Sequence, residues 1–141
     1  MAFSGEFQHG IDEKGRLIIP SSFRKALGEK YMLQKGQEGC LFAYPMESWL
    51  KLEEGVNNLS DFQRENRDYK RRFFSASREC DVDRQGRTLI YPDYREYAHL
   101  TKEVYILGVG NRIEIWDRVE WETYRLDLDD QADLSEEAGQ A

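Results

Sequence analysis

Two segments of the chain place an aspartate, a glycine and an arginine at the same spacing. Both read Asp-x-x-Gly-Arg, with Asp12, Gly15 and Arg16 in the first and Asp83, Gly86 and Arg87 in the second. An aspartate that opens a tight turn can accept hydrogen bonds from backbone N–H groups two residues on, and a glycine at the fourth position tolerates the left-handed conformation. The aspartate can also hold the arginine through a charge-assisted hydrogen bond. The pattern therefore predicts two tight turns that each orient an arginine.

The first turn carries two cations whose chemistry suits nucleic acid. Lys14 and Arg16 would place an ammonium and a planar guanidinium at one edge of a sheet. Cations neutralise backbone phosphates, and an arginine can donate two hydrogen bonds to guanine O6 and N7 in the major groove. The alternative is that each turn only supports the fold, because charged hairpin tips are common. The residues by themselves leave both interpretations open.

Other kinds of site chemistry find little support. The sequence contains no Gly-x-Ser-x-Gly elbow, no phosphate-binding glycine loop and no His-Glu-x-x-His motif, and Gly108 and Gly110 fit a hairpin turn. His9 is expected to be half-buried on a strand, and Cys80 occupies the equivalent position in the second half of the chain. We therefore expect no enzyme, no metal site, no cofactor and no small-molecule ligand.

The positioning elements come in two copies. A shift of 71 residues aligns the two motifs and also pairs Ile19 with Ile90 and Arg24 with Arg95; with one further residue inserted, Trp49 pairs with Trp121. Self-similarity over this length indicates a repeated unit. We expect four segments, namely a first unit at 5–56, a connecting helix at 57–75, a second unit at 76–126 and an acidic, disordered tail at 127–141.

Each unit has the pattern of a β-rich α+β fold. Two strands flank the turn, a short helix follows, and two more strands precede a closing helix. In the first unit these are strands at 7–11 and 17–19, a helix at 21–27 stopped by Gly28, strands at 31–33 and 40–44, and a helix with Pro45 in its first turn. In the second unit the matching elements are a helix at 93–98, strands at 104–107 and 112–116, and a helix whose capping box is Asp117 with Glu120. Trp49 and Trp121 are expected in the core.

The connecting segment is expected to be an amphipathic helix. Ser60 and Gln63 resemble a capping box, and the apolar stripe consists of Phe62, Tyr69 and Phe73. The basic face consists of Arg64, Arg67 and Arg71. Because Asp68 can pair with Arg72, we interpret this face as solvated, with DNA contact as the less favoured alternative.

The net charge of −7 conceals an uneven distribution. Residues 127–141 contribute −6 without one lysine or arginine, so residues 1–126 are almost neutral and can carry local basic surface. No apolar run reaches about 18 residues and no basic segment precedes a hydrophobic stretch at the N-terminus, which argues against membrane insertion and secretion. Two separated cysteines do not indicate a disulfide framework, so a cytoplasmic location is expected.

Several stretches resemble the MraZ family. The duplicated Asp-x-x-x-Arg signature corresponds to the motifs at 12–20 and 83–87, and further similarity is found at 3–5, at 23–24, at 76–80 and at 100–104. The resemblance covers nearly all of residues 1–126. It implies two tandem SpoVT/AbrB-like domains of the swapped-hairpin barrel type, packed as a pseudo-dimer with flanking helices.

The resemblance also implies a function. The family consists of bacterial DNA-binding transcriptional regulators that form ring-shaped homo-oligomers on the nucleoid. They typically repress the division and cell-wall gene cluster that contains their own promoter, through repeated guanine-rich boxes in double-stranded DNA. The arginine of the family that contacts DNA corresponds to Arg16; Lys14, Arg24 and Lys25 are added from local charge.

The second motif ranks lower as a DNA contact. Gln85 replaces Lys14, and aspartates add negative charge around Arg84 and Arg87. Ser4 stands where many relatives have an arginine, which removes one cation from the N-terminal arm. Two alternatives to a DNA-binding regulator stay open: an AbrB-like antitoxin, and an oligomeric protein-interaction scaffold that recruits a partner through the acidic tail.

Overall fold

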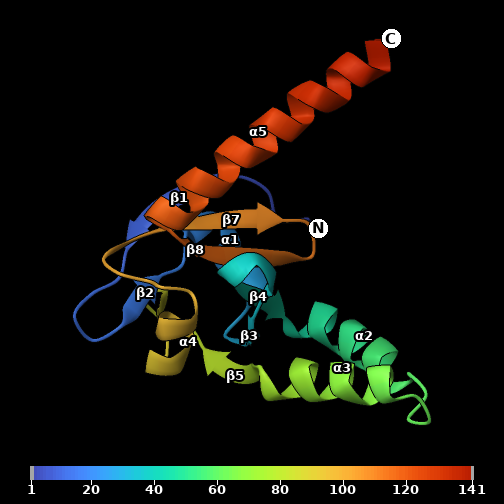
Figure 1. Ribbon diagram of the computed structural model, residues 1–141. Helices are drawn as coiled ribbons and strands as arrows, with labels where there is room; N and C mark the ends of the chain where they lie inside the picture. Colours follow the sequence, from blue (N-terminus) through green and yellow to red (C-terminus); the bar gives the residue numbers. More distant parts are fainter. Residues whose placement is uncertain (1, 141) are drawn as a thin grey trace.

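The computed structural model describes the backbone of residues 2–140 and the side chains of residues 2–132. Its elements in chain order are β1 (Glu6–Gly10), β2 (Arg16–Ile18), α1 (Ser21–Leu27), β3 (Lys30–Lys35), the 3₁₀ turn η1 (Gln37–Gly39), β4 (Leu41–Pro45), α2 (Met46–Asn57), α3 (Arg64–Ser75), β5 (Ser77–Asp81), β6 (Arg87–Leu89), α4 (Pro92–Tyr97), β7 (Glu103–Val109), β8 (Arg112–Asp117) and α5 (Arg118–Gln140). Figure 1 shows the sheets at the centre, an α2–α3 hairpin on one side and α5 projecting on another. The expected α+β class is confirmed.

The two repeats share their strands. A six-stranded antiparallel sheet has the order β1-β7-β8-β4-β3-β5. In this order β1 of the first repeat lies on β7 of the second, whereas β5 of the second lies on β3 of the first. Each repeat therefore gives an edge strand to the other, and neither completes its sheet alone.

The strands beside each turn do not form the simple pair that the sequence suggested. A single bridge, Ile11 to Leu17, joins the two arms of the first turn. Instead β2 pairs with β6 in a two-stranded antiparallel ribbon. The predicted pairing of the two strands that flank each turn was wrong, because β2 of the first repeat pairs with β6 of the second repeat.

The main core lies where the ribbon meets the large sheet. Equivalent positions of the two repeats contribute equally, since Ile19 and Ile90 are both fully buried, as are Leu41 and Ile113. Full burial of such a side chain is worth about 1.5–3 kcal/mol. The exchanged strands are thus held together by one shared core.

The two repeat-related tryptophans anchor separate satellite cores. Trp49 of α2 is buried and stacks on Phe73 of α3 with ring centroids 4.9 Å apart. Trp121 of α5 is partly buried and packs on Trp116 of β8 with centroids 5.1 Å apart. The expectation of a packing role is confirmed for both tryptophans.

The helix boundaries follow local signals. The helix α1 ends before Gly28, whose φ of 85° is the conformation that favours glycine. Pro45 was expected in the first turn of α2, but it is the last residue of β4 and directly precedes the helix. Its ψ of 150° is extended and not helical. The Asp117 side chain accepts hydrogen bonds from the N–H groups of Val119 (3.1 Å) and Glu120 (3.3 Å), which confirms it as the cap of α5.

Removing the Asp117 cap is expected to cost about 1–2 kcal/mol of the free energy of unfolding, because two N–H groups of α5 lose their acceptor. Urea denaturation of Asp117→Ala measures this change. Asp117→Asn keeps an acceptor oxygen and should lose less than half as much. Equal losses in the two variants would contradict a capping role.

The connecting segment differs from its prediction in three respects. The helix α3 begins at Arg64 rather than at the expected capping box, and the Ser60 hydroxyl accepts a bond only from the Phe62 N–H. Phe62 is 98% exposed instead of packing. Asp68 pairs with Arg64 and Arg71 and not with Arg72. The cause is the reversal between α2 and α3, which takes residues 58–63 out of the helix.

The acidic C-terminal segment is helical. The helix α5 continues to Gln140, through the region expected to be a disordered tail, while residue 141 lies outside the described residues. No proline interrupts this stretch, and its glutamate, leucine and alanine residues favour a helix. Among the described residues, none of the helices combines the length and the apolar character needed to cross a lipid bilayer.

Candidate nucleic-acid interface

The first turn is closed by its aspartate. One carboxylate oxygen of Asp12 accepts the backbone N–H groups of Lys14 and Arg16, each at 2.9 Å, and the other accepts Arg16 Nε at 2.9 Å. Gly15 N–H donates to the Asp12 carbonyl at 3.0 Å. The aspartate thus shapes the turn and fixes the base of the arginine side chain.

The second turn repeats this geometry. Asp83 accepts the N–H groups of Gln85 (2.9 Å) and Arg87 (2.8 Å) together with Arg87 Nε (2.9 Å). One contact has no counterpart in the first turn: Arg87 Nη2 donates to Gln85 Oε1 at 3.2 Å. Gln85, which replaces Lys14, therefore occupies a donor of its own arginine as well as removing a cation.

These bonds favour the ionised aspartates. The pKa of Asp12 is lowered from its ordinary value of 3.8, chiefly by the Arg16 backbone N–H, and the pKa of Asp83 is lowered chiefly by that of Arg87. A group whose pKa is lowered on folding stabilises the fold above its unfolded pKa and loses that contribution as pH falls through the folded value.

We expect both turns to stay closed from neutral pH to about pH 5 and to loosen below about pH 4. The measurement is an NMR titration of the Lys14 and Arg16 amides, which should shift together with the Asp12 carboxyl carbon. In Asp12→Asn the joint titration should disappear. An Asp12 carboxyl that titrates at or above 3.8 would show that the turn does not depend on its charge.

The two arginines lie on one face of the β2–β6 ribbon. In the register Arg16 is opposite Leu89 and Ile18 is opposite Arg87, while Leu17 is opposite Thr88. Directly opposed residues share a face. Leu17 and Thr88 are buried, so the other face is the outward one, and there Ile18 (45%) and Leu89 (40%) are notably exposed for aliphatic side chains.

Each turn is braced by the other repeat. The Ile19 N–H donates to the Gly86 carbonyl at 2.8 Å, and the Ile90 N–H donates to the Gly15 carbonyl at 2.9 Å. Both glycines are buried with φ near 80°, and a Cβ at Gly86 would lie 2.3 Å from the Arg24 guanidinium carbon. Only a glycine fits there without displacing that side chain.

Arg24 and its repeat partner therefore have a structural role. Arg24 is half-buried and its Nε donates to the Ile19 carbonyl at 2.8 Å. Arg95 occupies the equivalent place, against Gly15. Our candidate set included Arg24 for its charge and omitted Arg95, although the 71-residue repeat that pairs the two was the signal that could have identified it.

The remaining candidate cations are exposed beside the ribbon. Lys14 and Arg84 lie on the two turns and Lys25 lies on α1. Residues 12–27 contain four cations and two carboxylates, whereas residues 83–97 contain three of each. The first repeat is thus the more electropositive side of the ribbon.

The N-terminal arm lies away from the first turn. Phe3 forms a bridge with Gly110, and the Gly108 N–H donates to the Gly5 carbonyl at 2.8 Å. Ser4 is thereby placed beside the β7–β8 hairpin, at the opposite end of β1 from Asp12. Within one chain, an arginine at this position would not extend the Asp12 turn.

The other sequence candidates do not form a catalytic site. His9 is half-buried on β1 as expected, and His99 Nδ1 lies 3.0 Å from Glu120 Oε1 at the surface. Gly110, with φ of 70°, turns the β7–β8 hairpin as predicted. Within the described part of the chain no three His, Cys, Asp or Glu side chains gather as a metal site requires.

A family model matches the chain twice. The family is described as "MraZ protein, putative antitoxin-like", and the matched segments are residues 2–72 and 73–141. The two matches correspond to the two repeats, one for each Asp-x-x-Gly-Arg turn.

Curated relatives are similar over most of their length. The transcriptional regulator MraZ of Acetivibrio thermocellus is 51% identical over 122 residues, which cover 86% of this chain and 85% of that protein. The protein of the same name from Moorella thermoacetica is 48% identical over 129 residues, covering 92% and 90%. That of Pelotomaculum thermopropionicum is 50% identical over 123 residues, covering 87% and 85%.

Proposed function

The chain belongs to the MraZ family, as its motifs indicated, and from this premise we propose that it is a sequence-specific DNA-binding transcriptional regulator. This family is one of transcriptional regulators and not of enzymes. The observation that carries the proposal is the pair of aspartate-held arginines, Arg16 and Arg87, on the outward face of one ribbon.

The ribbon has the shape and chemistry to enter a major groove. The B-DNA major groove admits a two-stranded β-ribbon. Asp12 uses one of the five N–H donors of Arg16, so the terminal nitrogens remain for the two acceptors of a guanine. Ile18 and Leu89 can contact thymine methyl groups from the same face.

The flanking cations would hold the backbone. Lys14, Lys25 and Arg84 surround the ribbon, and phosphate contacts of this kind set position and orientation without reading sequence. The aspartates fix the arginines before DNA arrives, which reduces the conformational entropy lost on binding.

We extend the proposal to the biological setting that the family resemblance implies. The protein would repress the division and cell-wall gene cluster that includes its own promoter. It would bind repeated guanine-rich boxes as a ring-shaped homo-oligomer, in the cytoplasm and on the nucleoid. Each ribbon carries only a few cations, so several linked ribbons would supply the affinity.

An antitoxin role is the second candidate because the family description contains the word antitoxin-like. The tandem repeat argues against it, since AbrB-like antitoxins usually combine a single unit with an extended neutralising segment. A purified oligomer that binds the promoter specifically without a protein partner favours the regulator.

The direct test compares DNA from upstream of the protein's own gene with a scrambled duplex of equal length, by fluorescence anisotropy at one salt concentration. We expect binding to the promoter to be at least about 10³-fold tighter. Arg64→Ala, which changes an exposed arginine of α3 away from the ribbon, is the matched control and should bind like the unaltered protein. Equal affinity for both duplexes would rule out sequence recognition.

A further inference from the structure

Among the described side chains, residues 126–130 of α5 present a face without a partner in their own chain. The body-facing side of α5 is formed by Trp121, Tyr124 and Leu128, which line a hollow against β8. The other side carries Leu126, which is 66% exposed, and one helical turn further on Asp129 and Asp130. An isolated helical segment is marginally stable in water, so this acidic extension would gain from a docking partner.

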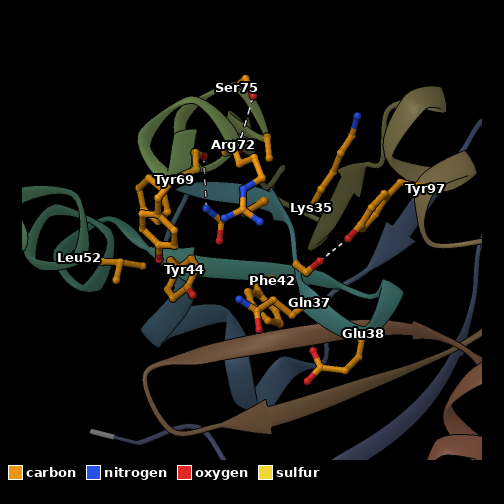
Figure 2. A pocket seen from close by; sticks show the side chains of 14 residues that line it. Lys35, Gln37, Glu38, Phe42, Tyr44, Leu52, Tyr69, Arg72, Ser75 and Tyr97 are labelled. Carbon is orange, nitrogen blue, oxygen red and sulfur yellow. Dashed lines mark hydrogen bonds between the residues drawn. The ribbon is translucent and has the colours of Figure 1, made fainter. Parts of the chain in front are cut away.

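A pocket of matching chemistry lies on the α2–α3 hairpin. It has a volume of about 670 Å³ and opens between the hairpin and the β3–β4 strands. Figure 2 shows aromatic and aliphatic walls made by Phe42, Tyr44, Leu52 and Tyr69. Glu38, the middle residue of the 3₁₀ turn η1, lies at the far rim.

Two cations line this pocket, Lys35 and Arg72, and Lys35 Nζ lies 3.7 Å from a carboxylate oxygen of Asp93. On α3, Arg64, Lys70 and Arg71 pair with aspartate carboxylates at 2.8–3.6 Å, and Arg67 Nη1 donates to the Asp61 carbonyl at 2.7 Å. Among the side chains that the structure describes, no carboxylate lies within 4 Å of the Arg72 guanidinium, which sits 5.9 Å from the centre of the Tyr69 ring. An exposed arginine beside aromatic walls has the chemistry to bind an apolar and acidic segment.

We propose that α5 of one copy docks into the α2–α3 pocket of a second copy. Leu126 would enter between the aromatic walls, and Asp129 and Asp130 would pair with Arg72. The same chain cannot make this contact, because its α5 points away from the hairpin (Figure 1). The contact therefore joins copies through two different surfaces, so it repeats from copy to copy and closes into a ring where the rotation allows.

This inference deepens the assembly in the proposed function by naming its surfaces. It is tested by sedimentation velocity on three variants. Arg72→Glu reverses the charge of the pocket arginine, Asp129→Lys with Asp130→Lys reverses the helix charge, and the third variant combines all three changes. We expect the first two to assemble at least about tenfold more weakly and the combined variant to recover.

Mixing the two defective variants gives a sharper result. The Arg72→Glu protein keeps its acidic helix and the reversed-helix protein keeps its pocket arginine, so the first variant can dock its helix into the second. The lysines of the reversed helix meet the carboxylate introduced at position 72 of the first variant, which is the same charge-swapped contact as in the combined variant. We therefore expect the mixture to assemble like the unaltered protein, with the two variants in alternation. Assembly of either variant alone at the level of the unaltered protein, or no recovery in the mixture or in the combined variant, would overturn the proposal.

Two controls separate docking from folding and from DNA binding. Arg64→Glu makes the same charge change on α3 away from the pocket and should leave assembly intact, whereas Leu126→Ala alters only an exposed side chain and should weaken it. If Arg72→Glu assembled normally but lost promoter binding, α3 would be a DNA contact and the docking proposal would be wrong. If the charge-swap pattern held for a protein that bound no DNA, the docking would stand and the proposed function would fail.

Discussion

Arg16→Ala is expected to weaken promoter binding by about 1–3 kcal/mol for each copy that engages the DNA, with larger losses where several copies bind together. The alanine removes the guanidinium that Asp12 holds on the outward face of the ribbon. Sequence discrimination should fall as well, because the arginine is assigned to a base edge and not to a phosphate.

Arg87→Ala should cost less than Arg16→Ala. Both arginines are on the same face, but Arg87 shares one terminal nitrogen with Gln85, and residues 83–97 around it contain as many carboxylates as cations, whereas residues 12–27 contain two more cations than carboxylates. Gln85→Lys should therefore raise affinity, since it frees that nitrogen and adds a cation.

Titration of promoter and scrambled DNA by anisotropy measures all three variants, with oligomeric state checked by sedimentation. Lys51→Ala, which changes an exposed residue of α2, serves as the control. Equal losses for Arg16→Ala and Arg87→Ala at unchanged assembly would contradict the ranking of the two turns.

Moving one promoter box by about 5 base pairs is expected to reduce affinity by about 10²–10⁴-fold, although every base in each box is kept. Half a helical turn places the second box on the opposite face of the DNA, where a second ribbon of the same oligomer cannot reach it. The loss is one of avidity and leaves single-box binding unchanged.

Moving the same box by about 10 base pairs, a full helical turn, returns it to the original face of the DNA and should recover most of the affinity. Titrations at several salt concentrations should give a steeper slope of log affinity against log salt on correctly spaced boxes than on one box, because more cations are engaged. Tight binding of a monomer to a single box would rule out the multivalent mechanism.

The sequence alone determined the features that depend on neighbours within a few residues. The two turns, with aspartate and glycine in their expected roles, follow from short-range hydrogen bonds and from the conformational freedom of glycine. The end of α1 at Gly28 and the capping of α5 by Asp117 have the same origin. The repeat and the α+β class could also be predicted from the sequence, because the spacing and alternation of apolar residues indicate which side of each element is buried.

Only the tertiary structure decided which strand pairs with which. Two similar repeats offer each strand a choice between its own unit and the other, and hydrophobic alternation is the same for both pairings. The shared core selects the exchange, with β1 on β7 and β5 on β3. That exchange creates the β2–β6 ribbon, brings Arg16 and Arg87 onto one face, and sets Arg24 and Arg95 behind the opposite turns.

The same reasoning explains the errors in the connecting segment and at the C-terminus. Phe62 fits a helical stripe, but the chain must reverse between α2 and α3 for Trp49 to stack on Phe73, and that distant contact outweighs the local pattern. Acidic composition suggested disorder beyond residue 126, yet the same residues extend a helix that capping and packing at Asp117 and Trp121 have already nucleated. Turns and helix caps depend on hydrogen bonds between residues that are close in the sequence, so the sequence alone predicts them. The choice among distant strand and helix partners depends on which arrangement of the whole chain buries the most apolar surface.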